Sequence, residues 1–161
     1  MNTVRPIPEG YHSVTPYLCV SNAAEALAFY EAAFGARELF RHLKPDGRIG
    51  HAEIQIGDSR IMLADAFPEH DFHTPAHYGG SPIAIHLYVE DVDAIVNQAI
   101  RAGAHLVRQV SDQFYGDRNG TVDDPFGHRW FISTHVEDVS PDEMERRAAA
   151  QAAVADNRDE V

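Results

Sequence analysis

The sequence lacks three features that would each indicate a particular class of protein. No run of 18 or more apolar residues occurs in its 161 residues, so we expect no membrane partner. The start, MNTVRPIP, lacks the apolar block of a signal peptide, and we therefore expect a cytoplasmic protein. The single cysteine, Cys19, excludes an internal disulfide and cannot by itself make a thiolate metal site.

Positive charge is also scarce. The chain has 13 lysine and arginine residues against 25 aspartate and glutamate residues, a net charge of -12. Such a chain repels the phosphates of a nucleic acid, so no nucleic-acid partner is expected. Hydrophobic residues make up 44%, which is enough for one real core or for two small modules that share a sheet.

The sequence does contain an internal repeat, in which the same order of predicted secondary-structure elements occurs twice. Hydrophobic periodicity, helix caps and turn residues predict strand, helix and three strands in each half. Ser21-Asn22 and Asp91 begin the two helices, and Gly35 and Gly103 end them. The predicted strands are 13–20, 36–43, 50–56 and 60–64 in the first half, and 83–89, 104–110, 115–122 and 128–134 in the second.

The repeat predicts an α+β fold in which two β-α-β-β-β modules form a curved mixed sheet around a cavity, with a helix at the C-terminus. Ser140-Pro141 begins that last helix with a cap and a proline in its first turn. The predicted parts are an N-terminal arm (1–11), a domain (12–136) made of module one (12–66), a linker (67–81) and module two (82–136), and a C-terminal helix and tail (137–161).

Three stretches carry a resemblance to a known family. They are residues 16–36, His51-Ala-Glu53, and Tyr115-Gly-Asp-Arg118 with Asp124-Pro-Phe-Gly-His-Arg-Trp130. With the repeat, they resemble the vicinal oxygen chelate superfamily, which includes glyoxalase I, bleomycin- and fosfomycin-resistance proteins and extradiol dioxygenases. The PhnB-like branch is the closer resemblance. It implies a homodimer in which paired modules complete each cavity.

The resemblance also implies where a metal would bind. Ligands in this superfamily usually come from the first and last strands of each module, as histidine and glutamate. The matching positions in this sequence hold Thr15, Ala84, Phe131 and either Ile61 or Met62. None of these side chains is a good ligand for a divalent cation, so the usual metal site is expected to be absent.

Strand alternation predicts which side chains line the cavity instead. Among them, Glu53 and His86 are the candidates for acid–base catalysis. Trp130 alternates away from Phe131 and is expected in the core. The predicted ligand-binding residues are Tyr17, Cys19, His51, Glu53, His86, Tyr88, Tyr115, Arg118 and Phe131.

Several of these residues allow two interpretations. His51, Glu53 and His86 would form a shifted metal site with two histidines and one carboxylate, or they would hydrogen-bond one another and water. Cys19 is either a nucleophile or a small buried hydrophobic residue. Arg118 either anchors a ligand or pairs with Asp117.

The linker holds three histidines, His70, His73 and His77. Their spacing allows a metal site, whereas a proline- and glycine-rich loop favours exposed or ligand-gating side chains. No glycine-rich nucleotide loop follows a strand, which argues against a methyltransferase.

The function predicted from the sequence is binding of a small, partly apolar molecule in an aromatic-lined cavity, without the usual metal site. The alternative is a metal-dependent lyase, isomerase or dioxygenase with a shifted His/Glu site. The sequence leaves open whether the ligand is turned over or only sequestered. It also leaves the identity of the ligand open.

Overall fold

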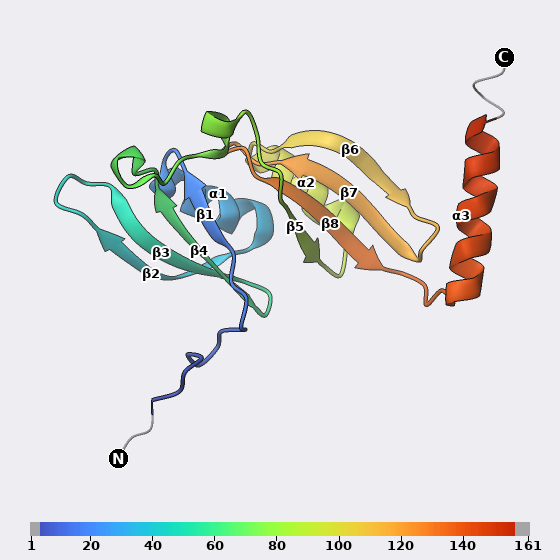
Figure 1. The fold of residues 1–161 in the computed structure, drawn as a ribbon, viewed down its shortest axis with the longest axis horizontal. Coiled ribbons are helices and arrows are strands. Elements are labelled where there is room, and N and C mark those ends of the chain that lie inside the picture. Colours follow the sequence, from blue (N-terminus) through green and yellow to red (C-terminus); the bar gives the residue numbers. More distant parts are fainter. Residues whose placement is uncertain (1–3, 157–161) are drawn as a thin grey trace.

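Each half of the chain folds into a four-stranded mixed sheet with one helix packed on one face (Figure 1). The structure is a computed structural model that describes residues 4–156. The parts of the predicted arm and tail that comprise residues 1–3 and 157–161 lie outside the described residues.

The two sheets have the same strand order, and this confirms the predicted fold class. In each module the first strand lies parallel to the last, and the remaining neighbours are antiparallel. The first module has strand order β1-β4-β3-β2 and the second has β5-β8-β7-β6. The first module comprises β1 (Tyr17–Val20), α1 (Ala23–Phe34), β2 (Arg37–Leu43), β3 (Ile49–Ile56) and β4 (Ser59–Asp65), and the second comprises β5 (Ala84–Tyr88), α2 (Val92–Ala102), β6 (His105–Asp112), β7 (Asp117–Asp123) and β8 (Arg129–His135).

Both helices begin and end at the predicted caps. The side chain of Asn22 accepts a hydrogen bond from the backbone N–H of Glu25, and that of Asp91 accepts one from Ala94. These bonds satisfy backbone donors that have no partner inside the helix. Gly35 ends α1 at φ 65°, a left-handed conformation that costs glycine little because it has no Cβ.

Two of the strands begin at least two residues later than predicted. β1 begins at Tyr17 rather than Ser13, because Pro16 has no N–H and joins the sheet only through its carbonyl, which accepts from Met62. β7 begins at Asp117 rather than Tyr115, because Gly116 turns the chain at φ 95°. Tyr115 therefore lies in the turn that joins β6 to β7.

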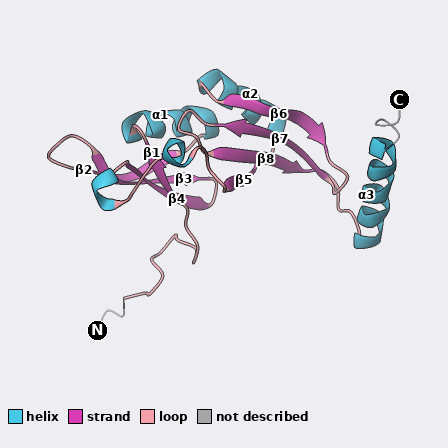
Figure 2. Cartoon of the chain, turned by 45° about the horizontal axis from the view of Figure 1, so that its top comes forward, coloured by secondary structure: helices cyan, strands magenta, loops and turns pink. Residues whose placement is uncertain are grey.

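The core lies between the sheets and the two helices. Figure 2 shows α1 and α2 on the same side of the sheets, and the Gln98 side chain of α2 donates to the carbonyl of Ala33 in α1 at 3.0 Å. Trp130 is fully buried there, as predicted from strand alternation. No α-helix of the described residues covers the opposite face of either sheet (Figure 2). The side chains of the candidate site lie on that face.

Two segments lie outside this frame. The linker contains two short 3-10 turns, η1 (Pro68–His70) and η2 (Pro75–Tyr78). The C-terminal helix α3 (Pro141–Asp156) stands apart from both sheets in Figure 1, and its first turns are held by the salt bridge from Arg147 to Glu137. None of the helices in residues 4–156 is both long enough and apolar enough to span a bilayer.

Candidate functional site

Three polar side chains form a hydrogen-bonded row on the uncovered face of module one. The Tyr17 hydroxyl lies 2.8 Å from His51 Nδ1, and His51 Nε2 lies 3.1 Å from Glu53 Oε1. The row follows from the sheet, because β1 carries Tyr17, β3 carries the other two at i and i+2, and β4 lies between these strands. Leu18 alternates away from Tyr17 into the core, as predicted.

The surroundings of this row favour a carboxylate at one end and a neutral phenol at the other. The Tyr11 hydroxyl, and after it His51, hold the pKa of Glu53 below its ordinary value despite partial burial. Burial, together with Cys19 and Glu53, raises the pKa of Tyr17 above its ordinary value. Near neutral pH the row therefore presents an anionic acceptor at Glu53 and a hydroxyl group at Tyr17.

An apolar pocket adjoins the Tyr17 end of the row. Its volume is about 220 Å³, and the ring of Tyr17 meets that of Phe72 edge-on at 5.6 Å between centroids. Phe40 lies on the other side of His51, with 6.2 Å between the ring centroids, and is 49% exposed. The pocket is lined by Tyr17, Gly50, Ala64, Phe67, His70 and Phe72.

The linker histidines differ in their positions. His70 lines the apolar pocket, whereas the rings of His73 and His77 stack on each other with centroids 3.9 Å apart. His73 Nε2 also lies 3.2 Å from the exposed carboxylate of Asp71. Of the three, only His70 lies where it would contact a ligand of the pocket.

Module two carries a second polar and aromatic group on its uncovered face. The ring of His86 stacks on that of Tyr88 with centroids 4.7 Å apart, and His86 Nε2 lies 2.8 Å from the Ser133 hydroxyl. Phe131 is the partner of His86 in the strand register and meets its ring edge-on. Three of the predicted ligand residues therefore lie together on this face.

A buried carboxylate organises the outer part of the same face. Asp117 is 5% exposed and accepts hydrogen bonds from the Tyr88 hydroxyl at 2.9 Å and from His135 at 2.7 Å. Nearby, the Tyr115 hydroxyl accepts a hydrogen bond of 2.6 Å from the side-chain amide of Asn119. Asp117, Ser133 and His135 were not among the predicted site residues, although alternation with Trp130 and Ile132 along β8 places Ser133 and His135 on this face.

A second cavity lies between the two modules, and we call it the inter-module cavity. Its volume is about 300 Å³, and it opens between the segment before β1, the turn from β3 to β4, and β5. Sequence reasoning placed Thr15, His86 and Tyr88 near a cavity, and all three line it. It did not identify His12 and Arg60, which line it as well.

Arg118 points away from these faces. Its guanidinium donates to the Asp93 carboxylate of α2 at 2.7 and 2.9 Å and to Asp112 at 3.0 Å. It therefore lies on the helix side of β7, and its partner is not Asp117, which faces the opposite way. We leave Arg118 out of the proposed site.

Cys19 is placed as a small buried residue. It is 6% exposed, and burial, together with the Asp65 carboxylate, raises the pKa of its thiol to about 11. A thiol with that pKa is protonated at neutral pH and is therefore a poor nucleophile.

The shifted metal site is not formed within one chain. Among residues 4–156, no three side chains of the types histidine, cysteine, aspartate and glutamate are placed to hold a metal ion. His86 is therefore not brought together with His51 and Glu53, and the linker histidines form no such group either. The positions of the family's usual ligands hold hydrocarbon or aromatic side chains and one hydroxyl (Thr15), which do not fit a divalent cation.

Comparison with known proteins identifies relatives for most of the chain. The family model of the Glyoxalase/Bleomycin resistance protein/Dioxygenase superfamily matches residues 10–132. An uncharacterized protein of Mycobacterium bovis is 42% identical over 142 residues, which are 86% of this chain and 93% of that protein.

Solved structures have the same fold. The crystal structure of a gene product of Arabidopsis thaliana is 28% identical and superposes with a TM-score of 0.62, covering 76% of this chain and 98% of that one. The PhnB protein of Bacillus cereus is 17% identical, with a TM-score of 0.60 and coverage of 76% and 99%. At that identity the second likeness concerns the fold alone.

Proposed function

Because the chain belongs to the glyoxalase/bleomycin resistance protein/dioxygenase superfamily, we propose that it binds a small, partly apolar molecule on the uncovered face of module one. The observation that carries the proposal is the Tyr17–His51–Glu53 row beside the apolar pocket. An apolar pocket with a few placed polar groups is the usual form of a small-molecule site, because burial supplies affinity and the polar groups set orientation.

The arrangement of the site indicates what kind of ligand it takes. The apolar part packs against the rings of Tyr17 and Phe72, which line the pocket and meet edge-on. A hydrogen-bond donor on the ligand reaches Glu53, whose carboxylate stays ionised, and an acceptor reaches the Tyr17 hydroxyl. The ligand is therefore a molecule with an aromatic or aliphatic end and a neutral or cationic polar end.

The active form in this proposal is a homodimer of the PhnB-like branch. On the two uncovered faces, four aromatic side chains remain well exposed: Tyr17 (45%), Phe40 (49%), Tyr88 (61%) and Phe131 (39%). Exposed aromatic side chains grouped in this way are typical of a surface that a partner or a ligand covers. A second copy that brings its module-two face opposite the module-one face would close the cavity around the ligand.

Binding without turnover is the form of the function that we favour. Catalysis would assign acid–base roles to Glu53 and His86, and His86 would have to come from the second copy because it lies in the other module. The alternative is a metal-dependent lyase, isomerase or dioxygenase, which needs His51, Glu53 and a second histidine around one metal ion. Within the described residues of one chain, no second histidine lies close enough to His51 and Glu53 to complete such a site.

The proposal is tested with the neutral fluorescent dye N-phenyl-1-naphthylamine, whose emission rises in apolar pockets. We expect saturable binding that Tyr17→Ala and Phe72→Ala each weaken about tenfold, since each change removes about 1.5 kcal/mol or more of apolar contact. Tyr78→Ala is the matched control, because Tyr78 is 66% exposed on the linker.

Two outcomes would count against this function. Equal dye affinity in the Tyr17, Phe72 and Tyr78 variants would move the site elsewhere. Stoichiometric zinc, iron, nickel or manganese in protein purified without chelator, lost on His51→Ala, would favour the metalloenzyme instead.

A further inference from the structure

The inter-module cavity differs in chemistry from the site proposed above. Its lining includes apolar side chains of β4 and β5, among them Ile61, Ile85 and Leu87. It also includes two basic side chains, His12 from the N-terminal arm and Arg60 from β4. A cavity that combines apolar surface with basic groups fits an organic anion.

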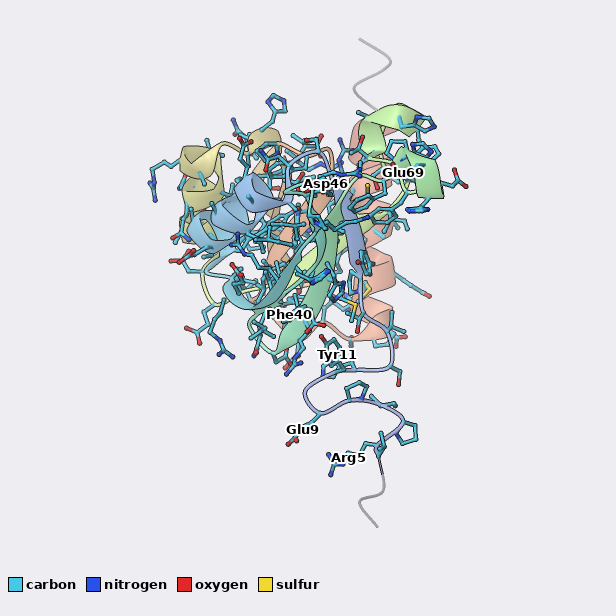
Figure 3. All side chains as sticks on the ribbon, turned by 90° about the vertical axis from the view of Figure 1, so that its left-hand side faces the viewer. Arg5, Glu9, Tyr11, Phe40, Asp46 and Glu69 are labelled. Atoms are coloured by element: carbon cyan, nitrogen blue, oxygen red, sulfur yellow. The ribbon has the colours of Figure 1, made fainter. Side chains whose placement is uncertain are left out.

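The N-terminal arm fixes the position of Arg60. The guanidinium carbon lies 4.4 Å from the centre of the Tyr11 ring, a cation–π contact, and Gly10 passes so close that a Cβ there would meet the guanidinium. Figure 3 shows Tyr11 where the arm reaches the end of the module-one sheet. A guanidinium held on an aromatic ring has less rotational freedom to lose when it binds a ligand.

Arg60 forms no ion pair among the described residues, and the same holds for Arg37 and Arg108 of the sheets. The charge of Arg60 acts on the Glu53 carboxylate, but Glu53 lies 3.1 Å from His51 Nε2 and forms no ion pair with Arg60. Other arginines of the sheets and of α3 bind carboxylates directly: Arg41 to Glu38, Arg48 to Asp46 and Glu69, Arg118 to Asp93, Arg129 to Asp123, and Arg147 to Glu137. Arg60 thus lies beside a cavity without a carboxylate partner among the described residues.

We propose that the inter-module cavity is an anion-binding site, in which Arg60 pairs with the carboxylate or phosphate group of a small organic acid whose apolar part packs against Ile85 and Leu87. Arginine forms parallel hydrogen bonds with both kinds of anion, and such charge-assisted pairs are about twice as strong as neutral ones. The imidazoles of His12 and His86 supply further donors at the same cavity.

One lining residue opposes this charge, and the geometry limits its effect. Asp58 is at the exposed turn between β3 and β4, where its carboxylate accepts a hydrogen bond from the Ser59 hydroxyl at 3.1 Å. A solvated carboxylate at the rim is screened by water and salt. The other ionisable side chains that line the cavity are Arg60, His12, His86 and Tyr88.

The chain contains its own reporter for this site, because Trp130 is the single tryptophan and lines the cavity. The probes are cyclohexanecarboxylate and cyclohexylphosphonate, which do not absorb where tryptophan does, and the neutral analogue cyclohexylmethanol. Full-length protein should show saturable changes in tryptophan fluorescence with one or both anions. The neutral analogue should bind about tenfold more weakly.

Variants separate pairing with Arg60 from general attraction by charge. Arg60→Gln should weaken anion binding about tenfold or more and leave the affinity for cyclohexylmethanol unchanged. Arg101→Gln makes the same change of charge on the exposed end of α2 and should have no effect. The preferred anion, carboxylate or phosphonate, tells which class of acid the site recognises.

Three results would overturn the proposal: no saturable change up to about 10 mM of either anion, equal binding of the neutral analogue, or equal losses from the Arg60 and Arg101 variants. The outcome is independent of the function proposed for module one. Tyr17→Ala should not alter anion binding, and Arg60→Gln should not alter binding of the neutral dye. The result for one binding site would therefore not decide the result for the other.

Discussion

The hydroxyl of Tyr30 donates a hydrogen bond of 2.7 Å to the carboxylate of Asp124, and this bond ties α1 of module one to the turn between β7 and β8 of module two. The same carboxylate accepts from the Trp130 indole at 3.0 Å and from the backbone N–H groups of Phe126 and His128 at 2.9 Å. Asp124 is 5% exposed, so one buried anion has four donors. The Asp-Pro-Phe-Gly turn thus couples the two modules as well as reversing the chain.

This network predicts a large loss of stability for Asp124→Asn. The amide would present a donor to groups that are themselves donors, and we expect the free energy of unfolding in urea to fall by about 3 kcal/mol. Tyr30→Phe removes one charge-assisted bond and should cost about 2 kcal/mol. The neighbouring Asp123→Asn is the control, because its salt bridge with Arg129 is partly exposed and should contribute less than about 1 kcal/mol. Equal losses at positions 123 and 124 would contradict this role.

Cys19 should react slowly with thiol reagents in the folded protein. With a pKa raised to about 11 from 9.0, its thiolate fraction near pH 8 is about a hundredfold lower than that of an ordinary thiol, and burial slows access further. The measurement is the rate of reaction with Ellman's reagent, with and without denaturant. Between pH 9 and the folded pKa the unfolded state loses its proton first, so stability should fall as pH rises. Rapid labelling of native protein at pH 8 would contradict this.

The sequence predicted the fold and much of the module-one site because both depend on periodic patterns. A strand has a period of two, so assigning Leu18 and Val20 to the core placed Tyr17 on the opposite face. His51 and Glu53 share a face for the same reason, and their distance to Tyr17 follows from the strand order.

The residues that sequence reasoning misplaced or missed depend on packing between segments that are distant in sequence. Arg118 is next to Asp117 in the chain, yet the register of β7 turns it towards Asp93 of α2. Arg60 lies at the inter-module cavity, where its guanidinium stacks on Tyr11 of an arm without periodicity. The separation of His86 from His51 is set by how the modules pack on each other, which no local pattern encodes.

His135 should titrate above its ordinary value. Asp138, and after it Asp117, raise the pKa of its imidazole by hydrogen bonding to the charged form. A raised folded pKa means that this contribution to stability is complete below the unfolded pKa of 6.5 and is lost as pH rises through the folded pKa. The pH dependence of the His135 ring chemical shift should report the higher pKa, and Asp138→Asn should lower that pKa.

A matched variant distinguishes the hydrogen bond from general charge. Asp142→Asn makes the same change of charge in the first turn of α3, and no hydrogen bond joins Asp142 to His135 among the described residues. Asp142→Asn should leave the pKa of His135 unchanged. Equal shifts in the Asp138 and Asp142 variants would show that the raised pKa comes from the net charge of the chain.

The proposed homodimer predicts a molecular mass in solution of twice the 17.9 kDa of one chain. Tyr88→Lys and Phe131→Lys place charges on the uncovered face of module two, where desolvating an ammonium group costs several kcal/mol, about enough to dissociate a micromolar dimer. Ile100→Lys is the control, since Ile100 is 37% exposed on α2, on the other side of the sheet. Light scattering should find the control dimeric and the two face variants monomeric, with unchanged circular dichroism. A monomeric mass for the unmodified protein would mean that the exposed aromatic faces have a different occupant.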